Sequence, residues 1–147
     1  MEKKPFVTLE QLKEIEKTYP TPYHLYDEKG IRENAKKLKE AFSWNKGFKE
    51  YFAVKATPNP FILKILKECG CGTDCSSLTE LMMSKACGFS GSDVMFSSND
   101  TPPEEFAYAD QMGAVINLDD FTHIQCLEET LGHIPETISC RKVSSRH

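Results

Sequence analysis

Lys55 is the residue of this sequence whose type and position best suit covalent chemistry. It follows the apolar run Tyr51-Phe-Ala-Val and precedes Ala-Thr-Pro-Asn-Pro60, where two prolines end the run. This pattern predicts a lysine at the carboxyl end of a strand, where α/β folds collect their functional groups. Its stem leaves an apolar environment, so we expect burial to favour the uncharged amine that Schiff-base formation requires. The alternative is a solvated surface lysine, the common state of this residue type.

Asp74 and Arg141 occupy matching positions at the ends of two later strand-like segments. Asp74 lies in Gly72-Thr-Asp-Cys-Ser, and Arg141 closes Thr137-Ile-Ser-Cys-Arg. We expect Asp74 to be the charge partner of an amine, and the Arg141 guanidinium suits a carboxylate or a phenolic oxygen. The alternatives are a helix cap for Asp74 and a solvated arginine for Arg141.

Other polar residues near the strand ends have local structural explanations. Asn99 and Asp100 precede Thr-Pro-Pro, and we expect them to cap the next helix. Ser77-Leu-Thr-Glu80 forms a capping box, which explains both of its polar ends without a catalytic role.

Strand-like and helix-like segments alternate behind these residues. The patterns predict helices over about 29–42, 60–70, 77–88, 101–113 and 119–132, and strands over about 51–55, 72–76, 94–97, 114–118 and 137–141. Strand ends recur about every twenty residues, as in a βα repeat of either a parallel barrel or a doubly wound open sheet. The glycine-rich phosphate loop of a nucleotide-binding sheet is absent after the first strand.

Composition and cysteine spacing exclude several classes of function. The formal charge of −4 comes from interleaved acidic and basic residues, with no basic face for nucleic acid. No stretch reaches the length of a membrane span, and the charged start lacks an apolar signal core, so we expect a cytoplasmic protein. The six cysteines lack the paired spacing of zinc sites, and we expect reduced thiols in an apolar core rather than a metal.

Several motifs, in order along the chain, resemble one known enzyme family. They are Thr21-Pro-Tyr-His-Leu-Tyr26, Tyr51-Phe-Ala-Val-Lys-Ala56, Gly70-Cys-Gly-Thr-Asp-Cys-Ser-Ser-Leu-Thr-Glu-Leu81, Phe96-Ser-Ser-Asn-Asp-Thr-Pro102 and Ile116-Asn-Leu-Asp-Asp120. Together they resemble the pyridoxal-phosphate enzymes built on an alanine-racemase-like barrel, and within that group diaminopimelate decarboxylase. The resemblance covers about residues 20 to 141.

The resemblance implies a fold, a cofactor and a reaction. The fold is a partial (β/α)8 TIM-type barrel of about five βα units, without the family's C-terminal β domain. Pyridoxal 5′-phosphate would be held by Lys55, the catalytic lysine, with Asp74 and Arg141 on the cofactor side. The reaction would be decarboxylation of meso-diaminopimelate to L-lysine, in an enzyme that is normally a homodimer. Ornithine, arginine or carboxynorspermidine are the alternative substrates of related decarboxylases.

The length sets an expectation for what this chain does alone. Complete barrels run to roughly 250 residues, and family members also use later elements: a histidine that stacks on the ring, phosphate-binding loops and an acid at the pyridine nitrogen. We therefore expect residues 1–147 to be an incomplete pyridoxal-phosphate-binding barrel domain and a truncated, inactive form of the enzyme. Residues 142–147 replace the family's Tyr-Asn-Pro-Gly-Gly run and are expected to be a non-family tail. The alternative hypothesis is a non-catalytic partial barrel that associates with another chain.

Overall fold

A computed structural model describes residues 4–141 as alternating helices and strands, so the predicted tail over 142–147 lies outside the described residues. The helices are α1 (Leu9–Glu16), α2 (Glu28–Ala41), α3 (Pro60–Glu68), α4 (Leu78–Ala86), α5 (Pro103–Gln111) and α6 (Thr122–Leu131). The strands are β1 (Tyr51–Ala53), β2 (Gly72–Cys75), β3 (Val94–Ser97), β4 (Val115–Leu118) and β5 (Ile138–Cys140). Short 3-10 turns η1 (Val54–Ala56) and η2 (Gly91–Asp93) complete the set. Each predicted helix and strand is confirmed to within a few residues.

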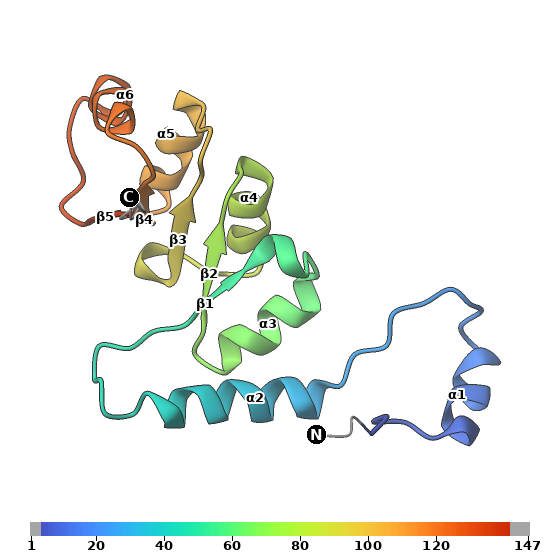
Figure 1. Cartoon of the computed structure of the whole chain (residues 1–147). Helices are drawn as coiled ribbons and strands as arrows, with labels where there is room; N and C mark the ends of the chain where they lie inside the picture. Colours follow the sequence, from blue (N-terminus) through green and yellow to red (C-terminus); the bar gives the residue numbers. More distant parts are fainter. Residues whose placement is uncertain (1–3, 142–147) are drawn as a thin grey trace, which may run out of the picture.

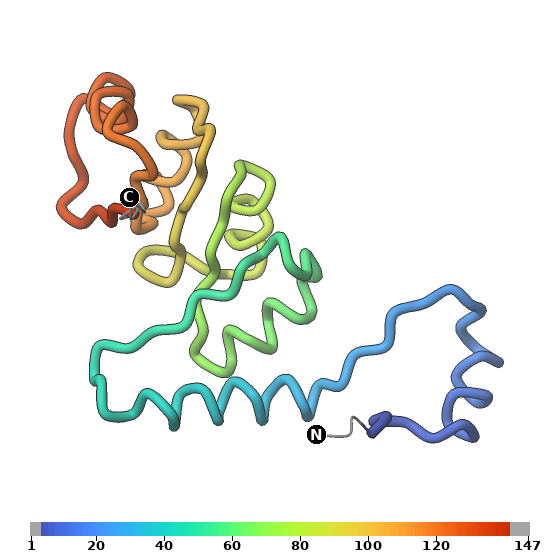
Figure 2. Tube along the Cα trace, in the orientation of Figure 1, coloured from blue at the N-terminus to red at the C-terminus, as the bar shows by residue number. Residues whose placement is uncertain are grey.

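The five strands form one parallel sheet in the order β1-β2-β3-β4-β5. Figure 1 shows the helices alternating with these strands, and Figure 2 follows the chain from one strand to the next. A doubly wound sheet reverses its strand order at a switch point, whereas a barrel adds each strand beside the last. The strand order therefore decides between the two predicted architectures in favour of a five-stranded arc of a barrel.

The two faces of the sheet differ in chemistry. The face toward the helices is buried and mostly apolar, and its strand residues are Thr73, Cys75, Val94, Phe96, Ile116 and Leu118. They pack with buried helix residues such as Leu63, Leu81, Phe106 and Leu127. The alternate residues on the inner face of the arc are half-buried and often polar, namely Ala53, Asp74, Met95, Ser97, Val115, Asn117 and Ser139. Alternation along each strand thus separates a packed core from a polar inner face.

The start of α4 shows how the sequence positions its helices. Ser77 Oγ accepts a hydrogen bond from the Glu80 N–H, as the predicted capping box requires. The Glu80 carboxylate accepts from the Ser76 N–H, one residue before the expected donor. Glu105 of α5 accepts from the Leu78 N–H at 3.0 Å, so a neighbouring helix completes the cap. The first turn of α4 is therefore fixed by residues from two helices.

The N-terminal arm, residues 4–26, contains a helix that the sequence patterns did not predict. This helix, α1, begins with a capping box between Thr8 and Gln11 and buries no residue. Figure 1 shows α1 standing apart from the sheet. Large apolar side chains are exposed along this arm: Phe6, Leu9, Tyr19, Leu25 and Tyr26. Within residues 4–141, no helix is long and apolar enough to cross a membrane.

The cysteines follow the expectation of a reduced core only in part. Cys71, Cys75 and Cys87 are buried free thiols, whereas Cys140 at the end of β5 is exposed. The side chain of Cys140 lies outside the core because β5 is an edge strand of the described sheet. Among the described side chains, no group of three or more histidine, cysteine or acidic residues is placed to hold a metal ion.

Candidate functional site

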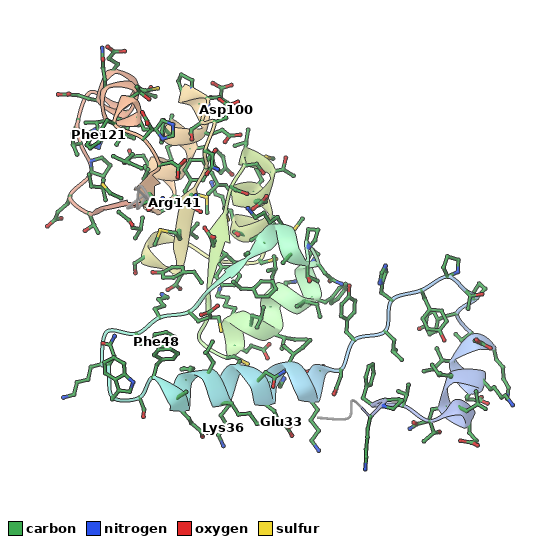
Figure 3. The ribbon with its side chains drawn as sticks, viewed as in Figure 1. Glu33, Lys36, Phe48, Asp100, Phe121 and Arg141 are labelled. Carbon is green, nitrogen blue, oxygen red and sulfur yellow. The ribbon has the colours of Figure 1, made fainter. Side chains whose placement is uncertain are left out.

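The carboxyl ends of the strands form one polar edge that contains all three predicted site residues. An open hollow of about 370 Å³ lies there, and it is lined by Lys55, Asp74, Ser76, Ser97, Ser98, Asn99, Asp100 and Arg141. Figure 3 labels Arg141, where β5 ends, and Asp100, in the connection from β3 to α5. Parallel strands end at the same side of a sheet, so residues far apart in sequence meet at this edge.

Lys55 was expected at the carboxyl end of the strand, but it lies two residues beyond the end of β1, in the 3-10 turn η1. Val54 turns into the core and is fully buried, which places the next side chain on the open side of the arc. Lys55 is exposed, so the expectation that its side chain is buried is wrong. Phe52 and Val54 of the run before it pack in the core, and the lysine itself faces the hollow.

Asp74 lies on β2, between β1, which leads into Lys55, and β3. Its register partners are Ala53 on β1 and Met95 on β3. The Ser97 hydroxyl donates a hydrogen bond to Asp74 Oδ1 at 2.6 Å. Since the cap of α4 is supplied by Ser77, the helix-cap alternative for Asp74 is wrong. Its half-buried carboxylate faces the hollow shared with Lys55.

Arg141 is held by three residues that the sequence did not connect to it. Its backbone N–H donates to the Leu118 carbonyl, which continues the β4–β5 pairing. Its guanidinium forms an ion pair with Asp119 at 3.1 Å and donates to Asn99 Oδ1 at 3.5 Å. The alternative of a freely solvated arginine therefore does not hold, although the side chain is partly exposed.

The residues expected to cap α5 do not cap it. The cap position of α5 is Pro102, without a side-chain hydrogen bond, so the prediction that Asn99 and Asp100 cap this helix is wrong. Asn99 instead accepts from Arg141. Asp120 binds the backbone N–H and the hydroxyl of Thr122, which keeps the pKa of the Asp120 carboxyl below its usual range.

A second hollow of about 270 Å³ continues from the first along the inner face. It shares Asp74, Ser97 and Arg141 with the first hollow and adds Tyr51, Met95, Asn117 and Ser139. The Ser139 hydroxyl donates to Asn117 Oδ1 at 2.8 Å. The polar edge and the polar inner face are therefore one continuous surface. No sequence pattern singles out Ser97 or Asn117, because hydrogen bonds between strands leave no local signal.

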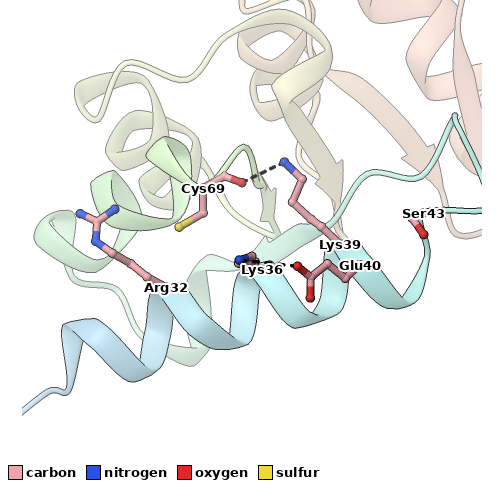
Figure 4. Close-up of a pocket in the computed structure, with 6 residues that line it drawn as sticks. All are labelled: Arg32, Lys36, Lys39, Glu40, Ser43 and Cys69. Atoms are coloured by element: carbon pink, nitrogen blue, oxygen red, sulfur yellow. Dashed lines mark hydrogen bonds and ion pairs between the residues drawn. The ribbon is translucent and has the colours of Figure 1, made fainter.

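A third hollow lies away from this edge, beside α2 (Figure 4), and its charges are already paired. Lys39 Nζ donates to the Cys69 carbonyl at the end of α3, and Lys36 pairs with Glu40 at 3.7 Å. Arg32 binds both Glu28 and Glu68. These contacts brace α2 against α3, so we assign this hollow a structural role.

The strand-end site contains three kinds of group with complementary chemistry. A primary amine can bond to a carbonyl carbon, a carboxylate can bind or accept a proton, and a guanidinium can bind an anionic oxygen. The site therefore suits a small anionic carbonyl compound.

Comparison with known proteins gives a consistent family match. Residues 28–144 match the family model of the pyridoxal-dependent decarboxylases, pyridoxal binding domain. The chain is 41% identical over 130 residues to Protein TabA of Pseudomonas amygdali pv. tabaci, and 31% identical over 128 residues to diaminopimelate decarboxylase of Thermoplasma acidophilum. These alignments cover 88% and 87% of this chain.

A solved structure is also similar in fold. Diaminopimelate decarboxylase from Helicobacter pylori complexed with L-lysine is 28% identical, with a TM-score of 0.72 over 81% of this chain. The chain spans 30% of the length of that protein and of both relatives above. The matching part of the H. pylori protein confirms the predicted arc of an alanine-racemase-like barrel.

Proposed function

The chain belongs to the pyridoxal-dependent decarboxylase family, and on that premise we propose that Lys55 is the lysine that binds pyridoxal 5′-phosphate, with Asp74 and Arg141 beside it. The observation that carries this proposal is the meeting of an amine, a carboxylate and a guanidinium around one hollow. The proposal gives each of these groups a separate task.

The donor set of the hollow fits this cofactor. An aldehyde needs a primary amine, and Lys55 supplies one that is exposed to the hollow. Anionic oxygens need a fixed cation, and Arg141 is fixed by Asp119 and Asn99. The volume of about 370 Å³ lies in the range of small-molecule sites.

The residues of this chain have roles of attachment, charge balance and orientation. When bound, pyridoxal phosphate supplies an electron-withdrawing ring for the carbanion that loss of carbon dioxide leaves. Lys55 holds the cofactor through Nζ. Asp74 balances the positive charge at that nitrogen and holds a proton there. Arg141 would bind a carboxylate or a phenolic oxygen in the same hollow.

We further propose that the reaction is the decarboxylation of meso-diaminopimelate to L-lysine. The support is indirect: the T. acidophilum and H. pylori relatives are named diaminopimelate decarboxylase, and the H. pylori protein is complexed with L-lysine. The family resemblance also supports a cytoplasmic homodimer as the working form. These statements about substrate and assembly apply to the whole enzyme.

Cofactor attachment is the first test, because it requires only the described residues. The protein is incubated with pyridoxal phosphate, reduced with borohydride and mapped by peptide mass spectrometry. We expect a pyridoxyl adduct on the peptide that contains Lys55 and its loss in Lys55→Ala. Lys64→Ala, which removes an exposed lysine from α3, is the matched control and keeps the adduct. Equal labelling of many lysines, unchanged in Lys55→Ala, would contradict the proposal.

Substrate identity needs a separate assay. Release of carbon dioxide is measured from carboxyl-labelled meso-diaminopimelate, ornithine and arginine with the cofactor-loaded protein. Release from ornithine or arginine alone would contradict the proposed substrate. An adduct at Lys55 without release from any substrate is the result expected from the prediction that this chain is inactive by itself.

A further inference from the structure

Two serine hydroxyls on the inner face donate to side chains on the neighbouring strand. Ser97 on β3 donates to Asp74 Oδ1 on β2 at 2.6 Å, and Ser139 on β5 donates to Asn117 Oδ1 on β4 at 2.8 Å. Both serines are half-buried and both line the inner-face hollow. They differ in their acceptors: one acceptor is a carboxylate of the candidate site, and the other is a neutral amide.

We propose that Ser97 is a positioning residue that fixes the Asp74 carboxylate for its work beside Lys55. The inference rests on the proposed function, since it concerns the same site. A hydroxyl bonded to an ionised carboxylate at this distance is a charge-assisted hydrogen bond, which is stronger and more directional than a neutral one.

The strand order explains why Ser97 is suited to this role. Asp74 lies on β2, between β1, which leads into Lys55, and β3, which carries Ser97. Ser97 binds Oδ1 from the β3 side, and no hydrogen bond to Oδ2 is found among residues 4–141. The second oxygen is therefore available to a group in the hollow that Asp74 shares with Lys55.

The packing of β3 does not depend on the Ser97 hydroxyl. Val94 and Phe96 bury the opposite face of the strand in the core, and Ser98 is buried just beyond it. Strand positions with one face exposed favour β-branched or aromatic side chains. A serine at this position is explained better by its carboxylate partner than by the stability of the strand.

The test compares Ser97→Ala with the matched control Ser139→Ala and the conservative variant Ser97→Thr. The affinity for pyridoxal phosphate and the rate of borohydride-trapped attachment at Lys55 are measured for each, together with the melting temperature. We expect Ser97→Ala to weaken binding or slow attachment by about tenfold, the typical effect of losing a hydrogen bond to a charged group. Ser97→Thr and Ser139→Ala stay within about threefold of the parent protein, and all three variants melt within about 4 °C of it.

A double-mutant cycle with Asp74→Asn separates positioning from a general effect on the fold. If Ser97 acts through the carboxylate, Asp74→Asn lowers attachment at least as much as Ser97→Ala, and adding Ser97→Ala to it changes nothing further. Additive losses would overturn the inference, as would equal losses in Ser97→Ala and Ser139→Ala.

The outcomes also distinguish this inference from the proposed function. If Asp74→Asn and Lys55→Ala impair attachment while Ser97→Ala does not, the positioning role is wrong and the proposed cofactor site stands. If neither Asp74→Asn nor Lys55→Ala impairs attachment, the proposed site is wrong, and the role of Ser97 is refuted with it.

Discussion

Phe106 on α5 provides the sharpest test of the core that supports the site. Its side chain is only 1% exposed and packs edge-on against Phe96 of β3 and His123 of α6, with ring centroids 6.2 and 5.8 Å away. Burying a phenylalanine contributes about 1.5–3 kcal/mol, and the cavity left by truncation raises the usual cost to about 3–5 kcal/mol. We therefore expect Phe106→Ala to lower the free energy of unfolding by about 4 kcal/mol.

The assay is urea and thermal unfolding followed by far-UV circular dichroism, because Trp44 is 77% exposed and its fluorescence is a poor reporter of the core. A loss of about 4 kcal/mol lowers the melting temperature by about 8–16 °C in a chain of this size. Phe121→Ala is the matched control: Phe121 is 88% exposed, and its removal should change stability by less than about 0.5 kcal/mol. A cost below about 1 kcal/mol for Phe106→Ala, or equal costs for the two variants, would refute the packing described for α5.

Four further predictions concern other parts of the fold. Burial raises the pKa of the Cys75 thiol from 9.0 to about 11, so iodoacetamide at pH 8 should label exposed Cys140 and leave Cys75 unmodified in mass maps. Because of this raised pKa, the Cys75 thiol contributes fully to the stability of the fold below about pH 9, and this contribution is lost as the pH rises through about 11. Urea titrations at pH 8 and pH 11 should show the loss as a lower unfolding midpoint at pH 11. Glu105→Ala leaves the Leu78 N–H without its acceptor and should lower the free energy of unfolding by about 1 kcal/mol, with Glu104→Ala as a neutral control. Removing the chain up to Pro20 should leave the melting temperature unchanged, because α1 buries no residue; a large decrease would show that the arm supports the core.

The sequence was sufficient to predict which residues share the strand-end edge. Lys55, Asp74 and Arg141 lie at or just beyond the carboxyl ends of strands in a βα repeat, and parallel pairing alone brings such ends together. Neither the number of strands across the sheet nor a precise register is needed for that inference. The resemblance then selected a barrel, and the strand order agrees with it.

Features that depend on distant partners were not predictable from local patterns. Asn99 follows the rule for a helix cap, but its partner is Arg141, 42 residues later. The bond from Ser97 to Asp74 likewise joins residues 23 positions apart on different strands. The exposure of Lys55 depends on which residues cover the inner face of the sheet. The apolar residues that precede Lys55 in the sequence carry no information about that.

Helix α1 in the N-terminal arm was missed for a different reason, because its sequence does contain a local signal for the start of a helix. Thr8-Leu-Glu-Gln11 is a capping box, and the structure forms both of its hydrogen bonds. That motif predicts the start of α1. The same motif does not predict that α1 buries no residue.

The sequential strand order has a consequence for how the protein is made. Paired residues on neighbouring strands, such as Tyr51 with Gly72 and Thr73 with Val94, lie only about twenty positions apart in the chain. Each βα unit can therefore dock on the previous one soon after it leaves the ribosome, without waiting for a distant segment. Contacts between residues that are closer in sequence favour faster folding than contacts between strands that are far apart in the chain. Assembly from β1 toward β5 would place the Lys55 edge first and add Arg141 last.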